Sequence, residues 1–305
     1  MVALIYGCGL HRESKHDRIG GSCVCLFRQE EGEYKLKAEF IIEKKGKIIY
    51  AQAPHIMAAG GLIHFFSTRF GGVSSGALSS LNLGVNRPDS LENVQENYRR
   101  ICAPYQIDAA RIVLSQQTHS TNIEIITDDC AGNGLFRPQQ FRDVDGMVCA
   151  TPDLAAVVFY ADCVPVLLYD PAKQVYAVVH AGWRGTVGGI AAKAAMVMQQ
   201  KFDSKPQDIL AAIGPSIGPC HFETGKEVGQ EFHKAGLGEA VADRGEKDYI
   251  DLWRANEIVL ERAGLLTQNV LHSGQCTVCN KDQYFSHRGD GPDTGRCGLI
   301  AQLDR

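Results

Sequence analysis

The chain has 305 residues, of which 45% are hydrophobic and 22% are charged, as is usual for a folded domain. Its 31 Lys and Arg residues against 35 Asp and Glu residues give a net charge of −4, which provides no basic surface for nucleic acid or an anionic membrane. No apolar stretch approaches the roughly 20 residues that span a bilayer, and the N-terminus lacks the pattern of a secretory signal. We therefore expect a cytoplasmic protein, whose 11 cysteines are mostly reduced thiols rather than a disulfide scaffold.

The first part of the chain differs in pattern from the rest. Residues 1–47 are assigned to an N-terminal extension for which no fold is predicted, and residues 48–305 to a single catalytic domain. A hairpin is predicted where the two parts meet, at residues 40–50, with its turn at Lys45-Gly46.

Strands and helices are predicted in irregular order from residue 62 onward. Ser90 and Asp251 stand as N-caps, whose side-chain oxygens accept a hydrogen bond from the first helical turn. Strands outnumber helices, so we expect an α+β fold of mixed β-sheets with flanking helices. The predicted strands are 62–67, 111–115, 122–127, 154–160, 164–169, 175–179 and 209–213, and the predicted helices are 90–105, 189–202 and 251–263.

Three residues at or just beyond predicted strands are candidates for one metal site: His119, Cys163 and His180. Cys163 and His180 are 17 residues apart, a separation that a β-hairpin can close, whereas the position of His119 does not follow from spacing. Two imidazoles and a thiolate suit zinc with one coordination position left open, as in catalytic zinc sites.

The loop that follows His180 is rich in glycine and leads into a helix. Backbone N–H groups at such a helix start can hold an anion, with Arg184 as a second contact, and Trp183 can stack on a flat ring. A tight turn that serves only the backbone is the alternative. Arg69, in an earlier glycine-rich loop, is a weaker candidate for contacting phosphate.

Two further cysteine motifs look like metal ligands without completing a site. Cys220 and His221 are adjacent, and because neighbouring side chains on an extended chain point to opposite faces, we do not expect both to bind one metal. Cys276 and Cys279 have the C-x-x-C spacing, but no second pair stands near them in the sequence. We expect a structural role for this pair, with a labile disulfide as the minor alternative.

Several short motifs in combination resemble the YfiH family, whose members are also called laccase-domain or polyphenol-oxidoreductase-like proteins. The resemblance covers about residues 48 to 305, and Gly289 stands where members commonly carry a second arginine. The motifs are Gln117-Thr118-His119-Ser120, Ala161-Asp162-Cys163, His180-Ala181-Gly182-Trp183-Arg184-Gly185, 213–217, Asp251-Leu252, and 286–288 through 294–296.

The resemblance implies a fold, a cofactor and an activity. It implies an α+β fold with mixed sheets and zinc bound by His119, Cys163 and His180. It also implies phosphorolysis of adenosine, inosine and S-methyl-5′-thioadenosine to base plus (methylthio)ribose 1-phosphate, and deamination of adenosine. The partners are then purine nucleosides and phosphate, with a monomer or a small homo-oligomer expected.

The residue chemistry is compatible with both reactions. A zinc-activated water can attack the purine ring, with Asp162 as a proton carrier or, alternatively, as the group that orients a ligand. Arg184 and Arg69 are the candidates for holding phosphate, and Trp183 for stacking on the base.

Three other functions remain open on the sequence. A copper polyphenol oxidase fits poorly, because 10 histidines without H-x-H pairs supply few copper ligands. A metal-free or zinc-assisted Cys–His hydrolase, with Cys163 as nucleophile and His180 as base, could act on an amide of a peptidoglycan precursor. A non-enzymatic protein with a structural zinc needs a fourth ligand, and only three good ligands are visible.

Overall fold

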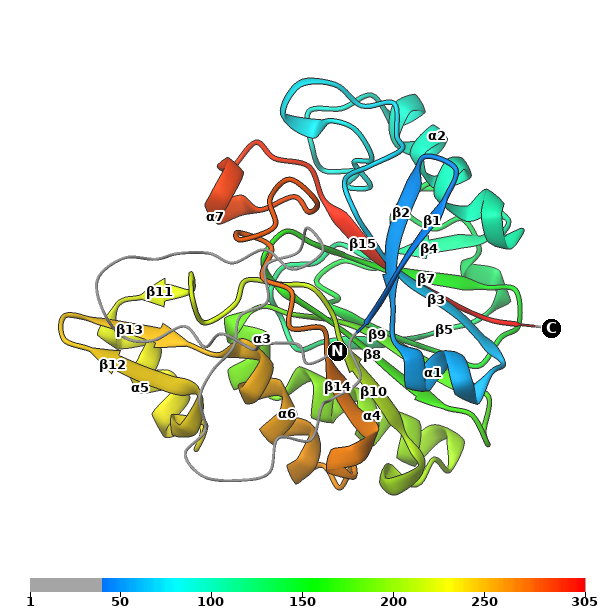
Figure 1. Cartoon of the computed structure of the whole chain (residues 1–305). Coiled ribbons are helices and arrows are strands. Elements are labelled where there is room, and N and C mark those ends of the chain that lie inside the picture. Colours follow the sequence, from blue (N-terminus) through cyan, green and yellow to red (C-terminus); the bar gives the residue numbers. More distant parts are fainter. Residues whose placement is uncertain (1–39, 305) are drawn as a thin grey trace, which may run out of the picture.

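Two six-stranded sheets pack face to face at the centre of residues 40–304, which are the residues that the computed structural model describes (Figure 1). The predicted α+β class is confirmed, because both sheets are mixed: the pairs β4–β7, β5–β6 and β10–β14 are parallel and their other pairs are antiparallel. The first sheet has the order β1 (Ile41–Lys45), β2 (Ile48–Gln52), β3 (Leu62–Ser67), β15 (Cys297–Leu303), β7 (Ala155–Tyr160), β4 (Ile112–Leu114). The second has the order β14 (Val270–His272), β10 (Leu210–Ile213), β8 (Val164–Asp170), β9 (Val175–Ala181), β6 (Gly146–Cys149), β5 (Ile123–Ile126).

Helices cover the outer faces of both sheets, so the central strands are buried on both sides. On the first sheet α2 (Leu91–Cys102) buries its apolar stripe against β3 and β7. On the second sheet α4 (Ile190–Phe202) and α6 (Leu252–Arg262) do the same. Every residue of β7, β8 and β9 is buried, which explains why these strands read as continuous apolar runs in the sequence.

The remaining elements lie at the edges of this sandwich. A small three-stranded sheet, β11–β13–β12, stands apart beside α5 (Figure 1). The bounds are β11 (Glu223–Thr224), β12 (Val241–Arg244), β13 (Lys247–Ile250), α1 (Pro54–Ala59), α3 (Trp183–Val187), α5 (Lys226–Lys234) and α7 (His287–Asp290). Among the described helices, none combines the length and the apolarity that crossing a bilayer requires.

Both predicted N-caps are confirmed. The Ser90 hydroxyl accepts from the backbone N–H of Asn93 at 3.1 Å, and the Asp251 carboxylate accepts from that of Arg254 at 3.0 Å. The predicted helix 90–105 is shorter, because α2 ends at Cys102 and a 3-10 turn follows it. The predicted strand 175–179 is longer, so His180 lies within β9 rather than after it.

Two hairpins were predicted from the sequence, and both are present. β8 and β9 pair with Val164 opposite Ala181, so the end of β9 returns beside the start of β8. β1 and β2 pair over five residue pairs, with the turn at Gly46-Lys47, one residue beyond the predicted position. The expected division at residue 48 therefore falls at the end of this turn, and residues 1–39 of the expected extension lie outside the described residues.

Candidate active site

The structure brings His119, Cys163 and His180 together, although the chain separates the first from the last by 61 residues. Their ligand atoms all lie within 4.8 Å of one another. The His119 Nε2 and Cys163 Sγ atoms are 3.6 Å apart, and the two imidazole rings meet edge to face with centroids 5.0 Å apart. His180 is buried, Cys163 is half-buried and His119 is exposed, so the cluster is reachable from one side.

The β8–β9 hairpin and one loop position these three side chains. Cys163 directly precedes β8 and His180 lies near the end of β9, whereas His119 belongs to the loop between β4 and β5. Gly182 permits the close approach: a Cβ atom there would lie 2.6 Å from His119 Cδ2 and 3.3 Å from Cys163 Sγ. Any larger residue at Gly182 would push the His119 ring away.

A buried carboxylate, Asp145, organises the cluster from behind. It is fully buried, and its Oδ1 lies 2.7 Å from His180 Nδ1. The backbone N–H of His119 donates to the same oxygen at 3.0 Å, and Ser120 donates to Oδ2 through its N–H and its hydroxyl, both at 2.8 Å. With Nδ1 held by Asp145, the Nε2 atom of His180 is left to face the cluster, as in metal-binding histidines.

The pKa values of Cys163, His180 and Asp145 are shifted, because these groups are partly or fully buried and stabilise one another's charged forms. Burial raises the pKa of Cys163, but the charge of His180 and a hydrogen bond with His119 outweigh it and lower the pKa to about 6. Burial lowers the pKa of His180, but the Cys163 thiolate and Asp145 raise it to about 9. Burial raises the pKa of Asp145, and the hydrogen bond and charge of His180 lower it to about 2. Cys163 is therefore available as a thiolate, the form that binds metals or attacks electrophiles.

The cluster opens into a cavity of about 400 Å³, a size suited to a small organic molecule. Besides the three clustered residues, its walls include the aromatic rings of Trp183, Phe159 and Phe222. Its charged walls include Arg87, Arg288 and Arg296. Apolar faces beside a few cationic groups suit a ligand that combines a flat ring with an anion.

Arg87 and Arg296 are the two cationic residues of this cavity that lie close enough to influence each other. The Arg87 Nε atom is buried and has no hydrogen-bond partner among the described residues. Burial lowers the pKa of Arg296, and the positive charge of Arg87 lowers it further, so the two guanidinium groups repel each other. An anion between them would relieve that repulsion and supply the missing acceptor.

The two arginines that the sequence suggested for phosphate lie elsewhere. The Arg69 guanidinium donates to the carbonyls of Ser79 and Lys281 and pairs with Asp290 at 3.1 Å, outside the cavity walls. Arg184 is exposed and stacks on Trp183, 4.2 Å from the ring centroid, and it does not line the cavity either. Trp183 itself does line it.

Asp162 lines the cavity, but its carboxylate is occupied by three donors. The Thr277 hydroxyl donates to Oδ1 at 2.5 Å, the Ser286 hydroxyl to the same oxygen at 2.7 Å, and the Arg288 backbone N–H to Oδ2 at 2.6 Å. This side chain therefore ties two distant loops to the residue before Cys163. The contacts favour an orienting role over proton transfer, because both oxygens already accept hydrogen bonds.

Sequence reasoning missed Asp145 and Arg87. Asp145 stands at the entry to the apolar strand β6, and an acid that borders a buried strand without a charged neighbour of opposite sign is a recognisable signal. Arg87 lies in a polar turn between Asn86 and Pro88, where nothing in the local sequence separates it from an ordinary surface residue. Arg296 belongs to a motif that carries the family resemblance, but its role was not assigned.

The chain is similar to a known protein family, to purine nucleoside phosphorylases and to a solved structure. The family model described as multi-copper polyphenol oxidoreductase laccase matches residues 63–304. A purine nucleoside phosphorylase of Deinococcus radiodurans is 35% identical over 242 residues, which is 79% of this chain and 89% of that protein. One of Bacteroides thetaiotaomicron is 34% identical over 238 residues, covering 76% and 88%. The crystal structure of YlmD from Geobacillus stearothermophilus matches 87% of this chain and 100% of its own, with a TM-score of 0.82 and 29% identity.

Proposed function

The chain belongs to the laccase-domain family that includes YfiH and YlmD, and on this premise we propose that it is a purine nucleoside phosphorylase with zinc at its active site. The names of its relatives support a nucleoside phosphorylase type of function. One observation carries the proposal: the His119–Cys163–His180 cluster and the Arg87–Arg296 pair face the same cavity of about 400 Å³.

Phosphorolysis breaks the bond between ribose C1′ and a purine nitrogen and forms a bond between C1′ and a phosphate oxygen, while the purine takes up a proton. The protein must therefore hold an anion close to a flat base. Arg87 and Arg296 are the groups suited to phosphate, because guanidinium donates to two phosphate oxygens at once. Trp183 and Phe159 supply the apolar faces on which a purine can stack.

The donor set of the cluster fits zinc. Tetrahedral zinc places a sulfur and a nitrogen ligand about 3.6 Å apart, and the His119 Nε2 to Cys163 Sγ distance is 3.6 Å. Zinc bound there supplies Lewis acidity and lowers the pKa of water toward about 7. Asp145 keeps His180 oriented, and Asp162, held by Thr277, Ser286 and Arg288, keeps the Cys163 segment in place. Copper remains the alternative metal, although two imidazoles are few for multi-copper chemistry.

The substrates we propose are adenosine, inosine and S-methyl-5′-thioadenosine for phosphorolysis, with deamination of adenosine as a second reaction. The test is chromatography of adenosine incubated with the purified protein, with and without phosphate, alongside metal analysis. We expect adenine only when phosphate is present and inosine in both conditions. Zinc-loaded protein that turns over no purine nucleoside would contradict the proposal.

The arginine pair gives the reaction a sharper test. Arg87→Gln should raise the KM for phosphate about 10-fold or more by removing one charge-assisted contact, and should leave phosphate-independent deamination within about 2-fold. Arg99→Gln, on the exposed face of α2, is the matched control and should change neither reaction. Equal loss of both reactions in Arg87→Gln, or a phosphate defect confined to Arg184→Gln, would contradict the assignment.

A cysteine hydrolase is the second candidate, and the lowered pKa of Cys163 beside His119 favours it. Replacing Cys163 abolishes either activity, so metal content separates them. A metal-free protein that is fully active and is inactivated by iodoacetamide at Cys163 would establish the hydrolase. Activity that requires about one metal ion at this cluster would exclude a metal-free cysteine hydrolase.

A further inference from the structure

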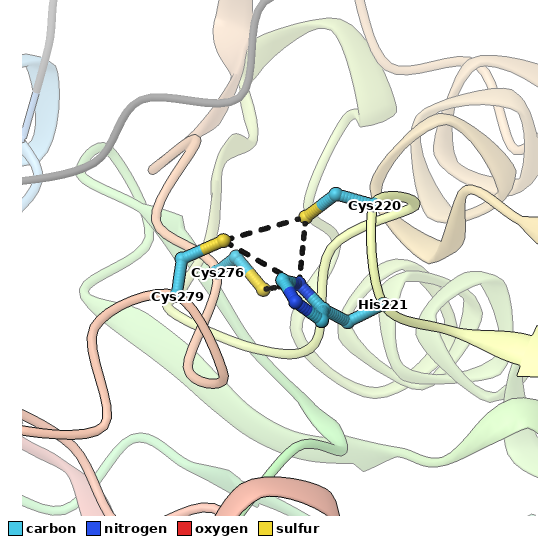
Figure 2. Close-up of side chains that lie close together, drawn as sticks. All are labelled: Cys220, His221, Cys276 and Cys279. Atoms are coloured by element: carbon cyan, nitrogen blue, oxygen red, sulfur yellow. Dashed lines mark hydrogen bonds between the residues drawn. The ribbon is translucent and has the colours of Figure 1, made fainter. Parts of the chain in front are cut away.

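Four side chains of the types that ligate metals meet outside the walls of the cavity. Cys220, His221, Cys276 and Cys279 converge from two loops, with their ligand atoms turned toward a common centre (Figure 2). The His221 Nδ1 atom lies 3.2 Å from Cys220 Sγ, 3.4 Å from Cys279 Sγ and 3.6 Å from Cys276 Sγ. The Cys220 and Cys279 sulfurs are 3.6 Å apart. None of the four lines the active-site cavity.

We propose that these four residues form a second, structural zinc site of the Cys₃His type. The expected geometry supports it: in tetrahedral zinc the sulfur–sulfur edge is about 3.8 Å and the sulfur–nitrogen edge about 3.6 Å. The four close distances that join His221 and the three cysteines lie between 3.2 and 3.6 Å. Thiolates with one imidazole select zinc over the hard cations magnesium and calcium.

A turn explains why adjacent residues can bind the same ion. The N–H groups of His221 and Phe222 both donate to the Gly218 carbonyl, at 2.9 and 3.0 Å. The chain is therefore bent, not extended, at Cys220 and His221, and the expectation that their side chains diverge was wrong. This pair supplies the second half-site that the C-x-x-C motif lacks in the local sequence.

Backbone hydrogen bonds join the loop that carries Cys220 and His221 to the loop that carries Cys276 and Cys279. The Thr277 N–H donates to the Ser216 carbonyl at 3.0 Å, and Ser216 N–H to the Gln275 carbonyl at 3.2 Å, which locks the two loops side by side. The Gly218 N–H donates to Cys276 Sγ at 3.2 Å, the contact expected for a thiolate ligand. Glycine suits position 218, because a Cβ there would lie 2.9 Å from Trp253 Cη2, 3.1 Å from Cys276 Cβ and 3.3 Å from Cys220 Sγ.

The charge of the site is compensated locally. Binding one zinc ion releases three protons from the thiols, and three thiolates with a neutral imidazole and Zn²⁺ carry a net charge of about −1. The guanidinium of Arg288, in α7, reaches the loop that carries His221 and donates to the carbonyls of His221 at 3.0 Å and Glu223 at 3.2 Å. A cation beside an anionic centre stabilises it.

The site also ties together loops that reach the active centre. Thr277, inside the C-x-x-C turn, donates to Asp162, the residue before Cys163. Arg288, which holds the His221 segment, donates through its N–H to the other Asp162 oxygen. With four protein ligands and no open position, this zinc would support the active centre without touching substrate.

The experiment is metal counting on the full-length chain, purified under reducing conditions with zinc supplied. We expect about two zinc ions per chain, with one lost in Cys279→Ser and the other lost in His119→Ala. Cys130→Ser, a half-buried cysteine outside both clusters, is the matched control and should keep both. Cobalt loaded into His119→Ala should show intense sulfur-to-cobalt absorption that the His119→Ala/Cys279→Ser double variant lacks.

A measurement on the unmodified chain covers the case in which Cys279→Ser does not fold. Titration with a mercurial, followed by a colorimetric zinc indicator, should release zinc in step with modification of Cys220, Cys276 and Cys279, located by peptide mass mapping. About one zinc per chain, unchanged in Cys279→Ser, would overturn the proposal. A disulfide among the three cysteines in protein kept reduced would overturn it as well.

Discussion

This molecule contains two clusters of cysteine and histidine, each offering sulfur and imidazole nitrogen as ligand atoms. We propose that one holds a catalytic metal and the other a structural metal. His119, Cys163 and His180 supply three ligands at the wall of a cavity, backed by the buried carboxylate of Asp145. Cys220, His221, Cys276 and Cys279 supply four ligands between two loops, away from that cavity. Ligand number and access, not ligand type, distinguish a site that can act on a substrate from one that can only hold the fold.

The largest effect that separates the clusters is expected at His180. His180→Ala should lower kcat on the order of 1000-fold, because it removes a metal ligand where Lewis acidity is needed. The melting temperature should fall by only a few degrees, because Asp145, which loses its His180 partner, still accepts hydrogen bonds from His119 and Ser120. Turnover and thermal melting of the same preparation check this, and unchanged turnover would remove the cluster from the active site.

Cys279→Ala should show the reverse pattern. Loss of a structural zinc is expected to destabilise the fold by about 3–5 kcal/mol, or roughly 10 °C in melting temperature, because metal binding contributes directly to folding. Turnover per folded molecule should stay within about 10-fold at low temperature. Differential scanning calorimetry with a matched activity assay decides this, and Cys130→Ser serves as control. A stable but inactive Cys279→Ala protein would contradict a purely structural role for the second cluster.

Asp145→Asn tests whether the Asp145 carboxylate orients the His180 ring for metal binding. The amide keeps the shape but removes the charge that fixes the His180 ring, so metal affinity and turnover should fall about 10–100-fold. Competition with a zinc chelator measures the affinity. The same substitution should leave the metal of the second cluster bound, and loss of both metals would show that Asp145 acts on the whole fold.

The smallest expected effect concerns the link between the clusters. Thr277→Val removes one of the three donors to Asp162 and should cost about 1 kcal/mol of stability. Turnover should fall less than 10-fold, whereas Thr277→Ser, which keeps the hydroxyl, should match the natural chain. Urea unfolding and steady-state kinetics check both variants. Equal behaviour of the valine and serine variants would break the proposed link.

Local features of this protein were readable from the sequence. Ser90 and Asp251 were identified as caps because a cap involves hydrogen bonds within three residues. The pairing of Cys163 with His180 was anticipated because a single hairpin, β8–β9, joins them. The apolar runs predicted these two strands and β7, since burial on both faces leaves few polar residues to confuse the pattern.

Tertiary structure alone decided the contacts between distant loops. His119 reaches Cys163 because the sheet that contains β4 packs against the sheet that contains β8. Cys220 with His221 reaches the C-x-x-C turn 55 residues later because β10 and β14, which precede these loops, are parallel neighbours in one sheet. Arg87 and Arg296, more than 200 residues apart in the chain, likewise line one cavity only in the folded structure. Local sequence encodes hydrogen bonds a few residues apart, whereas such meetings depend on how whole sheets pack and on backbone bends, such as the turn at Gly218, that no periodicity reveals.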